Sequence, residues 1–116
     1  MFNSVWRFVV SVSAFRINEE DDSFELGFEI PIAREKFFIK FWQVAIDELG
    51  ITEIKNGIDL KNEHLSSTLH ELEQLRNWAE SNLQNNDLNY IVSRINLLMR
   101  ELPTAFKTEH TTLWIG

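Results

Sequence analysis

The chain has 116 residues, with 18 acidic and 11 basic side chains and a formal net charge of −7. This length fits a single domain over residues 1–116, and 44% hydrophobic residues exclude a disordered chain. The acidic balance argues against nucleic acid or an anionic membrane as partner, because both are bound through clusters of Lys and Arg. The chain contains no cysteine, which is typical of a reducing compartment, so we expect a cytoplasmic protein.

The N-terminal part of the chain alternates apolar and polar residues with the period of two that is typical of strands. Residues 5–17 predict a first strand, in which Phe15 and Ile17 change parity and so indicate a bulge or a second covered face. After a polar turn, residues 24–32 predict a second strand with the strictest alternation in the chain, so we expect a hairpin. Pro31 lacks a backbone N–H and therefore indicates an edge position or the end of that strand.

From residue 34 onward the apolar residues recur at intervals of three and four, which is typical of an amphipathic helix. Residues 34–49 predict an aromatic-rich helix, and Gly50 is placed to cap its C-terminus. The aromatic residues come in two adjacent pairs, Phe37-Phe38 and Phe41-Trp42. Neighbours in a helix cannot share one stripe equally, so either the stripe is wide or one member of each pair is displayed.

The second half of the chain predicts two more helices. Residues 51–60 contain an Asn-Gly pair, which is compatible with a tight hairpin and equally with a plain connection. Residues 66–82 predict the second helix. Asp87 can cap a third helix over residues 88–102, which Pro103 ends because its ring clashes with the preceding turn and it has no N–H to donate.

The Thr-rich tail, residues 106–115, predicts a final strand, which we expect to lie beside the first strand. The predicted element order is therefore β-β-α-α-α-β. This order is typical of an α+β domain, in which an antiparallel sheet of three or more strands has about three helices packed on one face.

Known catalytic, metal and phosphate-binding motifs are absent from the sequence. His70 and Glu71 resemble the start of a zinc-protease helix, but Gln74 occupies the position of the second histidine. Glu25 and Glu29 could act as paired carboxylates, although solvated charges on the outer face of the second strand explain them better. The four glycines are too dispersed to hold a phosphate. We therefore expect a protein without enzymatic activity, metal or cofactor, which acts by binding another molecule.

Two groups of residues are candidates for contact with an electropositive partner. The first is a run of four acids between the first two strands, which is either an ordinary turn or a site that attracts basic groups. The second lies on the second helix, where Trp78 is either a partly exposed anchor or a residue at the margin of the core. The predicted contact residues are Glu19, Glu20, Asp21 and Asp22 in the first group and Glu71, Glu73, Trp78 and Glu80 in the second.

Three segments resemble parts of the small cytosolic immunity proteins of bacterial polymorphic-toxin and contact-dependent growth inhibition systems. They are FELGFEI at residues 24–30, FFIKFW at residues 37–42 and LHELEQL at residues 69–75. The general layout of residues 24–102 is similar as well. The resemblance implies a protein that binds and neutralises a cognate toxin domain, often a basic nuclease, inside the producing cell. It transfers no functional residue by position.

A different class of function is a non-catalytic structural or regulatory subunit that acts as a homodimer. Two copies could pair through an exposed sheet edge near residues 113–115 or through the aromatic helix. An enzyme with an unrecognised site would instead need a deep pocket into which polar groups converge.

Overall fold

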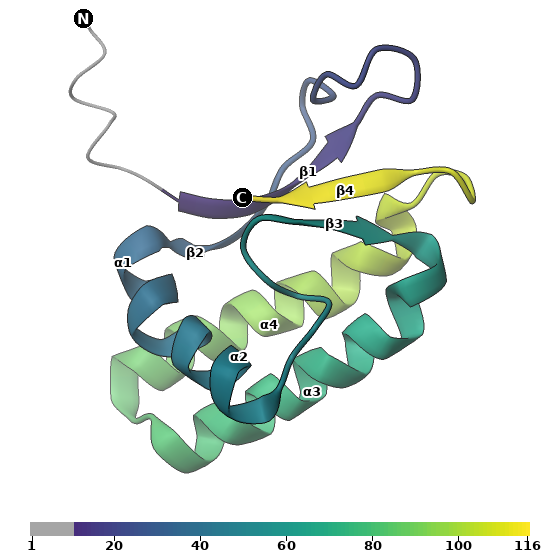
Figure 1. Cartoon of the computed structure of the whole chain (residues 1–116). Helices are drawn as coiled ribbons and strands as arrows, with labels where there is room; N and C mark the ends of the chain where they lie inside the picture. The colour runs from purple at the N-terminus through teal and green to yellow at the C-terminus, as the bar shows by residue number, and fades with distance from the viewer. Residues whose placement is uncertain (1–10) are drawn as a thin grey trace, which may run out of the picture.

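The structure is a computed structural model and describes residues 11–116 of the chain. It confirms the predicted α+β class, with a four-stranded antiparallel sheet and a layer of helices on one side of it (Figure 1). The elements in chain order are β1 (Ser11–Ile17), β2 (Ile30–Arg34), α1 (Glu35–Phe37), η2 (Phe38–Trp42), α2 (Gln43–Leu49), β3 (Ile58–Lys61), η3 (Asn62–His64), α3 (Leu65–Asn82), α4 (Asn85–Ala105) and β4 (Thr112–Ile115). Residues 5–10 of the predicted first strand lie outside the described residues. No helix within residues 11–116 has the length and apolar character needed to cross a membrane.

The sheet has the strand order β2-β1-β4-β3, and each neighbouring pair is antiparallel. The prediction that the C-terminal strand lies beside the first is confirmed, since Ala14 pairs with Ile115 and Ile17 with Thr112. On its other side β4 pairs with β3, a strand that the predicted element order lacks. β4 is therefore an interior strand, so residues 113–115 do not offer the free edge through which a homodimer could pair.

The hydrophobic core fills the space between the sheet and the helices (Figure 1). Burial of these apolar side chains is the main favourable contribution to folding. Fully or almost fully buried members include Ala14, Leu60, Leu113 and Ile115 from the strands, and Phe38, Trp42, Leu72, Leu75, Ile91, Ile95 and Leu98 from the helices.

The predicted second strand is wrong over residues 24–29. The regular ladder with β1 begins only at Ile30, and before it Phe24 forms a single bridge with Ile17. Between these points the chain turns at Gly27, whose φ of +79° lies in the left-handed region that favours glycine. The alternation does not mark core positions here, because Phe24 and Leu26 are both exposed. The edge position inferred from Pro31 is confirmed, because β2 is an outer strand.

The aromatic helix runs through α1, η2 and α2, and Gly50 caps it with a φ of +67°, as predicted. Its middle is a π-helical turn, in which the rings of Phe38 and Trp42 stack with centroids 5.8 Å apart. Both of these residues are buried, whereas Phe37 and Phe41 are half-buried. Each aromatic pair therefore buries its second member and partly displays its first.

The helix α3 begins within one residue of the predicted start. The helix α4 begins earlier and ends later than the predicted range of residues 88–102. Its N-cap residue is Gln84, and Asp87 lies in the first turn, where a carboxylate is favourable toward the helix dipole. Pro103 does not end the helix, which continues to Ala105. The missing N–H of Pro103 costs one bond in the last turn, and burial of Leu102 and Ala105 in the core outweighs it.

The segment between α2 and β3 is a plain connection and not a hairpin. Ile58 pairs with Ile115 of β4, and no ladder joins it to Ile54. Gly57 turns the chain with a φ of +81°, and its N–H donates a 2.6 Å hydrogen bond to the carbonyl of Ile115. The Asn-Gly turn therefore leads directly into β3, which begins beside the last residues of β4.

Candidate partner-binding surface

The four acids Glu19, Glu20, Asp21 and Asp22, here called the acidic loop, follow β1. The loop rises from the sheet on the side away from the helices, and all four of its residues are exposed (Figure 1). Asp21 accepts hydrogen bonds from the hydroxyl of Ser23 at 2.6 Å and from its N–H at 3.1 Å, and these bonds lower the pKa of Asp21. The N–H of Asn18 donates to the carbonyl of Ser23 at 2.7 Å and closes the turn.

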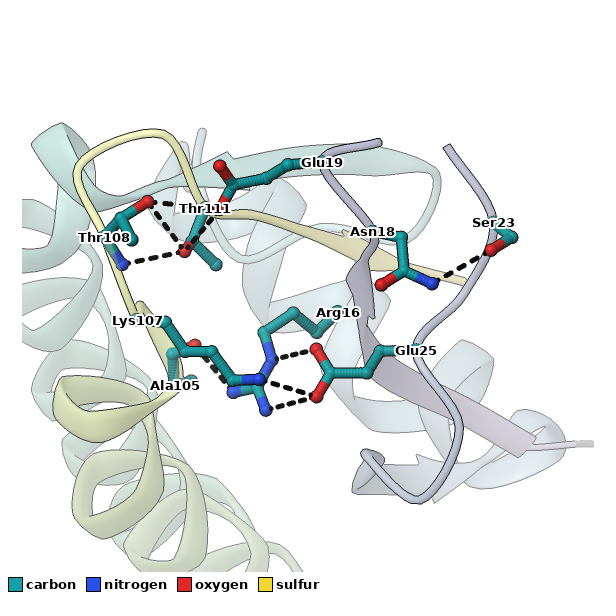
Figure 2. A network of polar contacts seen from close by, with 9 residues as sticks. All are labelled: Arg16, Asn18, Glu19, Ser23, Glu25, Ala105, Lys107, Thr108 and Thr111. Atoms are coloured by element: carbon teal, nitrogen blue, oxygen red, sulfur yellow. Dashed lines mark hydrogen bonds and ion pairs between the residues drawn. The ribbon is translucent and has the colours of Figure 1, made fainter. Parts of the chain in front are cut away.

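An ion-pair network fixes one side of the base of this loop (Figure 2). The Arg16 guanidinium donates to both carboxylate oxygens of Glu25, at 2.7 and 2.9 Å, and also to the carbonyl of Ala105 at 2.9 Å. Lys107 Nζ donates to Glu25 at 2.9 Å. Hydrogen bonds from Arg16 and then from Lys107 lower the pKa of Glu25 to about 2. The network joins the chain after the acidic loop to the C-terminal end of α4.

Glu19 fixes the other side of the loop (Figure 2). Its carboxylate accepts a hydrogen bond from the hydroxyl of Thr108 at 3.1 Å and a longer one from Thr111 at 3.5 Å. Both threonines precede β4, so the two ends of the acidic loop are tied to the same neighbouring segment. Glu20 and Asp22 have no such tie within residues 11–116 and extend toward solvent.

The charge of the acidic loop is not compensated within the part of the chain that the structure describes. The ion pairs among residues 11–116 involve the carboxylates of Glu25, Glu53, Glu101 and Glu109, and none involves the loop. Four carboxylates on one exposed turn therefore produce a local negative potential that attracts cationic groups.

Glu71 does not lie on the predicted acidic surface, and its assignment as a partner contact is corrected here. Its side chain faces inward, and only 8% of the residue is exposed. The carboxylate accepts hydrogen bonds from the backbone N–H groups of Thr52, Glu53 and Ile54, at distances between 2.9 and 3.2 Å. Glu71 lies three residues after Thr68 and four before Leu75, on the buried side of α3, and this spacing was the signal in the sequence for its structural role.

The other members of the second predicted group remain on the surface of α3. Glu73 and Glu80 are exposed, and Trp78 is half-buried against the core. The indole Nε1 of Trp78 donates a 2.9 Å hydrogen bond to Glu48 of α2. This group lies in the helical layer, whereas the acidic loop lies beyond the opposite side of the sheet (Figure 1). The structure therefore does not bring the two predicted groups into one surface.

The sequence prediction missed a group of aromatic residues on the sheet face that points away from the helices. Phe15 and Trp114 are neighbours across β1 and β4, and both are half-buried. Phe24 stacks on Phe15 with ring centroids 5.0 Å apart. The change of parity at Phe15 and Ile17 was the signal, because it placed apolar residues on both faces of β1.

The two carboxylates that suggested acid–base chemistry, Glu25 and Glu29, have other contacts. Glu25 is held in the Arg16 network, and Glu29 accepts a 2.6 Å hydrogen bond from the hydroxyl of Ser13. Neither belongs to a regular strand, so their expected place on a solvated strand face is wrong. His64 lies 3.7 Å from Glu53. Within residues 11–116, no three His, Asp or Glu side chains are grouped to hold a metal ion.

Comparisons of the chain with models of protein families, with characterised proteins and with solved structures found no match. The functional interpretation therefore depends on the residues of this chain.

Proposed function

We propose that this protein is an immunity-type inhibitor, which binds a cognate toxin domain and neutralises it in the cytoplasm of the cell that makes both. We propose further that the toxin domain is a basic nuclease. The observation that carries the proposal is the acidic loop, whose four exposed carboxylates pair with no cation among residues 11–116. A protein surface rich in Lys and Arg is its electrostatic complement.

The anchoring of the loop supports this role. Arg16, Glu25 and Lys107 hold its C-terminal side, and Glu19 holds its N-terminal side through Thr108. A loop that is already held in one conformation loses less conformational entropy when it binds a partner. A turn needed only to reverse the chain would require neither the four charges nor the ties on both sides.

The charge of the loop also explains how binding would inhibit a nuclease. A nuclease recognises phosphates through Lys and Arg in its substrate groove. Carboxylates bound in that groove occupy the places of the phosphates and keep the substrate out. The same charges accelerate encounter by long-range attraction, which weakens as salt screens them.

The proposal is tested by titrating the protein with the C-terminal domain of the protein encoded directly upstream, at low and at high salt. A toxin and its inhibitor are useful only when they are inherited together, so the neighbouring gene is the first place to look. We expect nanomolar one-to-one binding that weakens as the salt concentration rises. Failure of a folded, basic domain to bind at low salt would contradict the proposal.

The contribution of the loop is tested by replacing Glu20 and Asp22 with serine, because these two acids have no side-chain tie within residues 11–116. We expect association with the same domain to slow by about tenfold and its salt dependence to flatten, because the steering charges are lost. The matched control is the double variant Glu73→Ser and Glu80→Ser, which removes exposed acids of the same kind from α3. If the control slows association and the loop variant does not, the partner binds the helical side.

A further inference from the structure

The sheet face that points away from the helices is the least explained surface of the molecule. Its strand positions follow from the pairing register: Phe15, Trp114 and Asp59 form one row across β1, β4 and β3, and Ile17, Thr112 and Lys61 form the next. With Phe24, which bridges to Ile17, these residues are here called the outer face. Their neighbours along each strand, such as Leu60 and Leu113, are fully buried under the helices.

The outer face is more apolar than a solvated sheet face is expected to be. An antiparallel sheet with one face in water usually carries polar residues there. Here Phe15, Ile17 and Trp114 are half-buried, and Phe24 is 49% exposed although it stacks on Phe15. Among residues 11–116 no helix covers this face (Figure 1). A contiguous exposed aromatic group of this kind is typical of an interaction site.

The turn that leads from the acidic loop to β2 adds a second apolar feature. Leu26 is 96% exposed, so within the described chain its side chain has almost no packing partner. It follows Phe24 by two residues, in the same short segment that the Arg16 network holds in place. The aromatic centre, the exposed leucine and the acidic loop therefore belong to one continuous part of the molecule.

We infer that the outer face is the docking surface for the basic domain of the proposed function, and this inference rests on that function. The aromatic side chains would contact an apolar centre on the partner, and the acidic loop and Asp59 would contact basic groups around it. This division follows the usual anatomy of interfaces, in which buried aromatic anchors supply affinity and charged margins supply steering and orientation.

The charge distribution favours a basic partner over a second copy of this chain. A twofold interface places the same surface on both sides. Two copies joined through the outer face would bring together two acidic loops and two Asp59 side chains, with Lys61 as the one cation among the outer-face residues named above. Like charges across an interface oppose association, so this surface is suited to a partner of opposite charge.

The experiment compares two double variants in the titration with the upstream domain. Phe24→Ser with Leu26→Ser removes apolar groups from the proposed surface, at residues that are 49% and 96% exposed. The matched control, Val44→Ser with Ile39→Ser, removes apolar groups of 48% and 59% exposure from the aromatic helix. We expect the first pair to weaken binding by about 30-fold with an unchanged salt dependence, as loss of an interface anchor does, and the control to bind like the parent protein.

Each other outcome overturns the inference. If the parent binds and the Phe24 pair binds equally well, the docking surface lies elsewhere while the proposed function stands. If the parent protein does not bind the upstream domain, both this inference and the proposed function fail. If sedimentation shows that the parent is a dimer and the Phe24 pair a monomer, the outer face joins two copies. If Leu26→Ser alone, at a residue that is 96% exposed, lowers the melting temperature far more than the control does, the face is covered by the chain itself.

Discussion

Two glutamates hold loops in this molecule, and they do so in opposite surroundings. Glu71 is 8% exposed and binds three successive backbone N–H groups of the connection after α2. The side chain of Glu25 is 26% exposed and binds two cationic side chains at the base of the acidic loop. A buried carboxylate leaves its partners unsatisfied when it is removed, whereas water can replace an exposed one. We therefore expect Glu71 to stabilise the whole fold and Glu25 to orient one loop.

The largest effect is expected from Glu71→Ala. The substitution leaves the N–H groups of Thr52, Glu53 and Ile54 without their acceptor, and among these residues Ile54 is fully buried. We expect the free energy of unfolding to fall by about 2–4 kcal/mol, because each unsatisfied buried group has a large desolvation cost. Urea denaturation measures this loss. Glu73→Ala, on the exposed side of the same helix, is the control and should change stability by less than about 0.5 kcal/mol.

A smaller effect is expected from Arg16→Ala. The Arg16 side chain is 12% exposed, packs over the ring of Phe28 at 4.0 Å and joins Glu25 to the carbonyl of Ala105. We expect a loss of about 1–2 kcal/mol in urea denaturation, which is less than for Glu71→Ala because Glu25 retains Lys107 and solvent. Lys107→Ala is the matched control, since it removes the more exposed cation of the same network. An equal loss in both variants would show that the packing of Arg16 is unimportant.

The smallest effect is expected from Glu25→Gln, and it depends on pH. The pKa of Glu25 is lowered to about 2 from an ordinary value of 4.5, so its ion pairs contribute to stability above pH 4.5 and lose that contribution as the pH falls toward 2. The parent should therefore be slightly more stable than Glu25→Gln at neutral pH, and the two should converge near pH 2. Thermal unfolding at several pH values measures the difference. A difference that persists at pH 2 would contradict the assignment of the ion pairs.

Sequence patterns were most successful where one residue type has one structural consequence. Gly50 ended the aromatic helix because a left-handed cap favours a residue without a side chain. The adjacent aromatic pairs left two arrangements open, a wide apolar stripe or one displayed member of each pair. Only the structure shows that Phe38 and Trp42 are buried, whereas Phe37 and Phe41 are half-buried. Pro31 was correctly placed in an edge strand. In each case the constraint acts within a few residues along the chain.

Predictions were less successful where the outcome depended on distant residues. The alternation around Leu26 predicted a strand. The chain instead turns at Gly27, and Glu25 binds the distant Lys107 as well as Arg16. Pro103 was expected to end α4, but the helix continues to Ala105, which is buried in the core. The four-residue strand β3 was missed because its pairing with β4 joins segments about fifty residues apart.

For the candidate surface, the sequence by itself determined the charge of the acidic loop and its exposed position in a turn. Charged residues next to each other in a polar segment have few ways to become buried. The tertiary structure decided which carboxylates are free to act, since Glu71 is enclosed by the connection after α2 and Glu19 is tied to Thr108. It alone also placed Trp114 beside Phe15, because the register between the last strand and the first is set by the packing of the core.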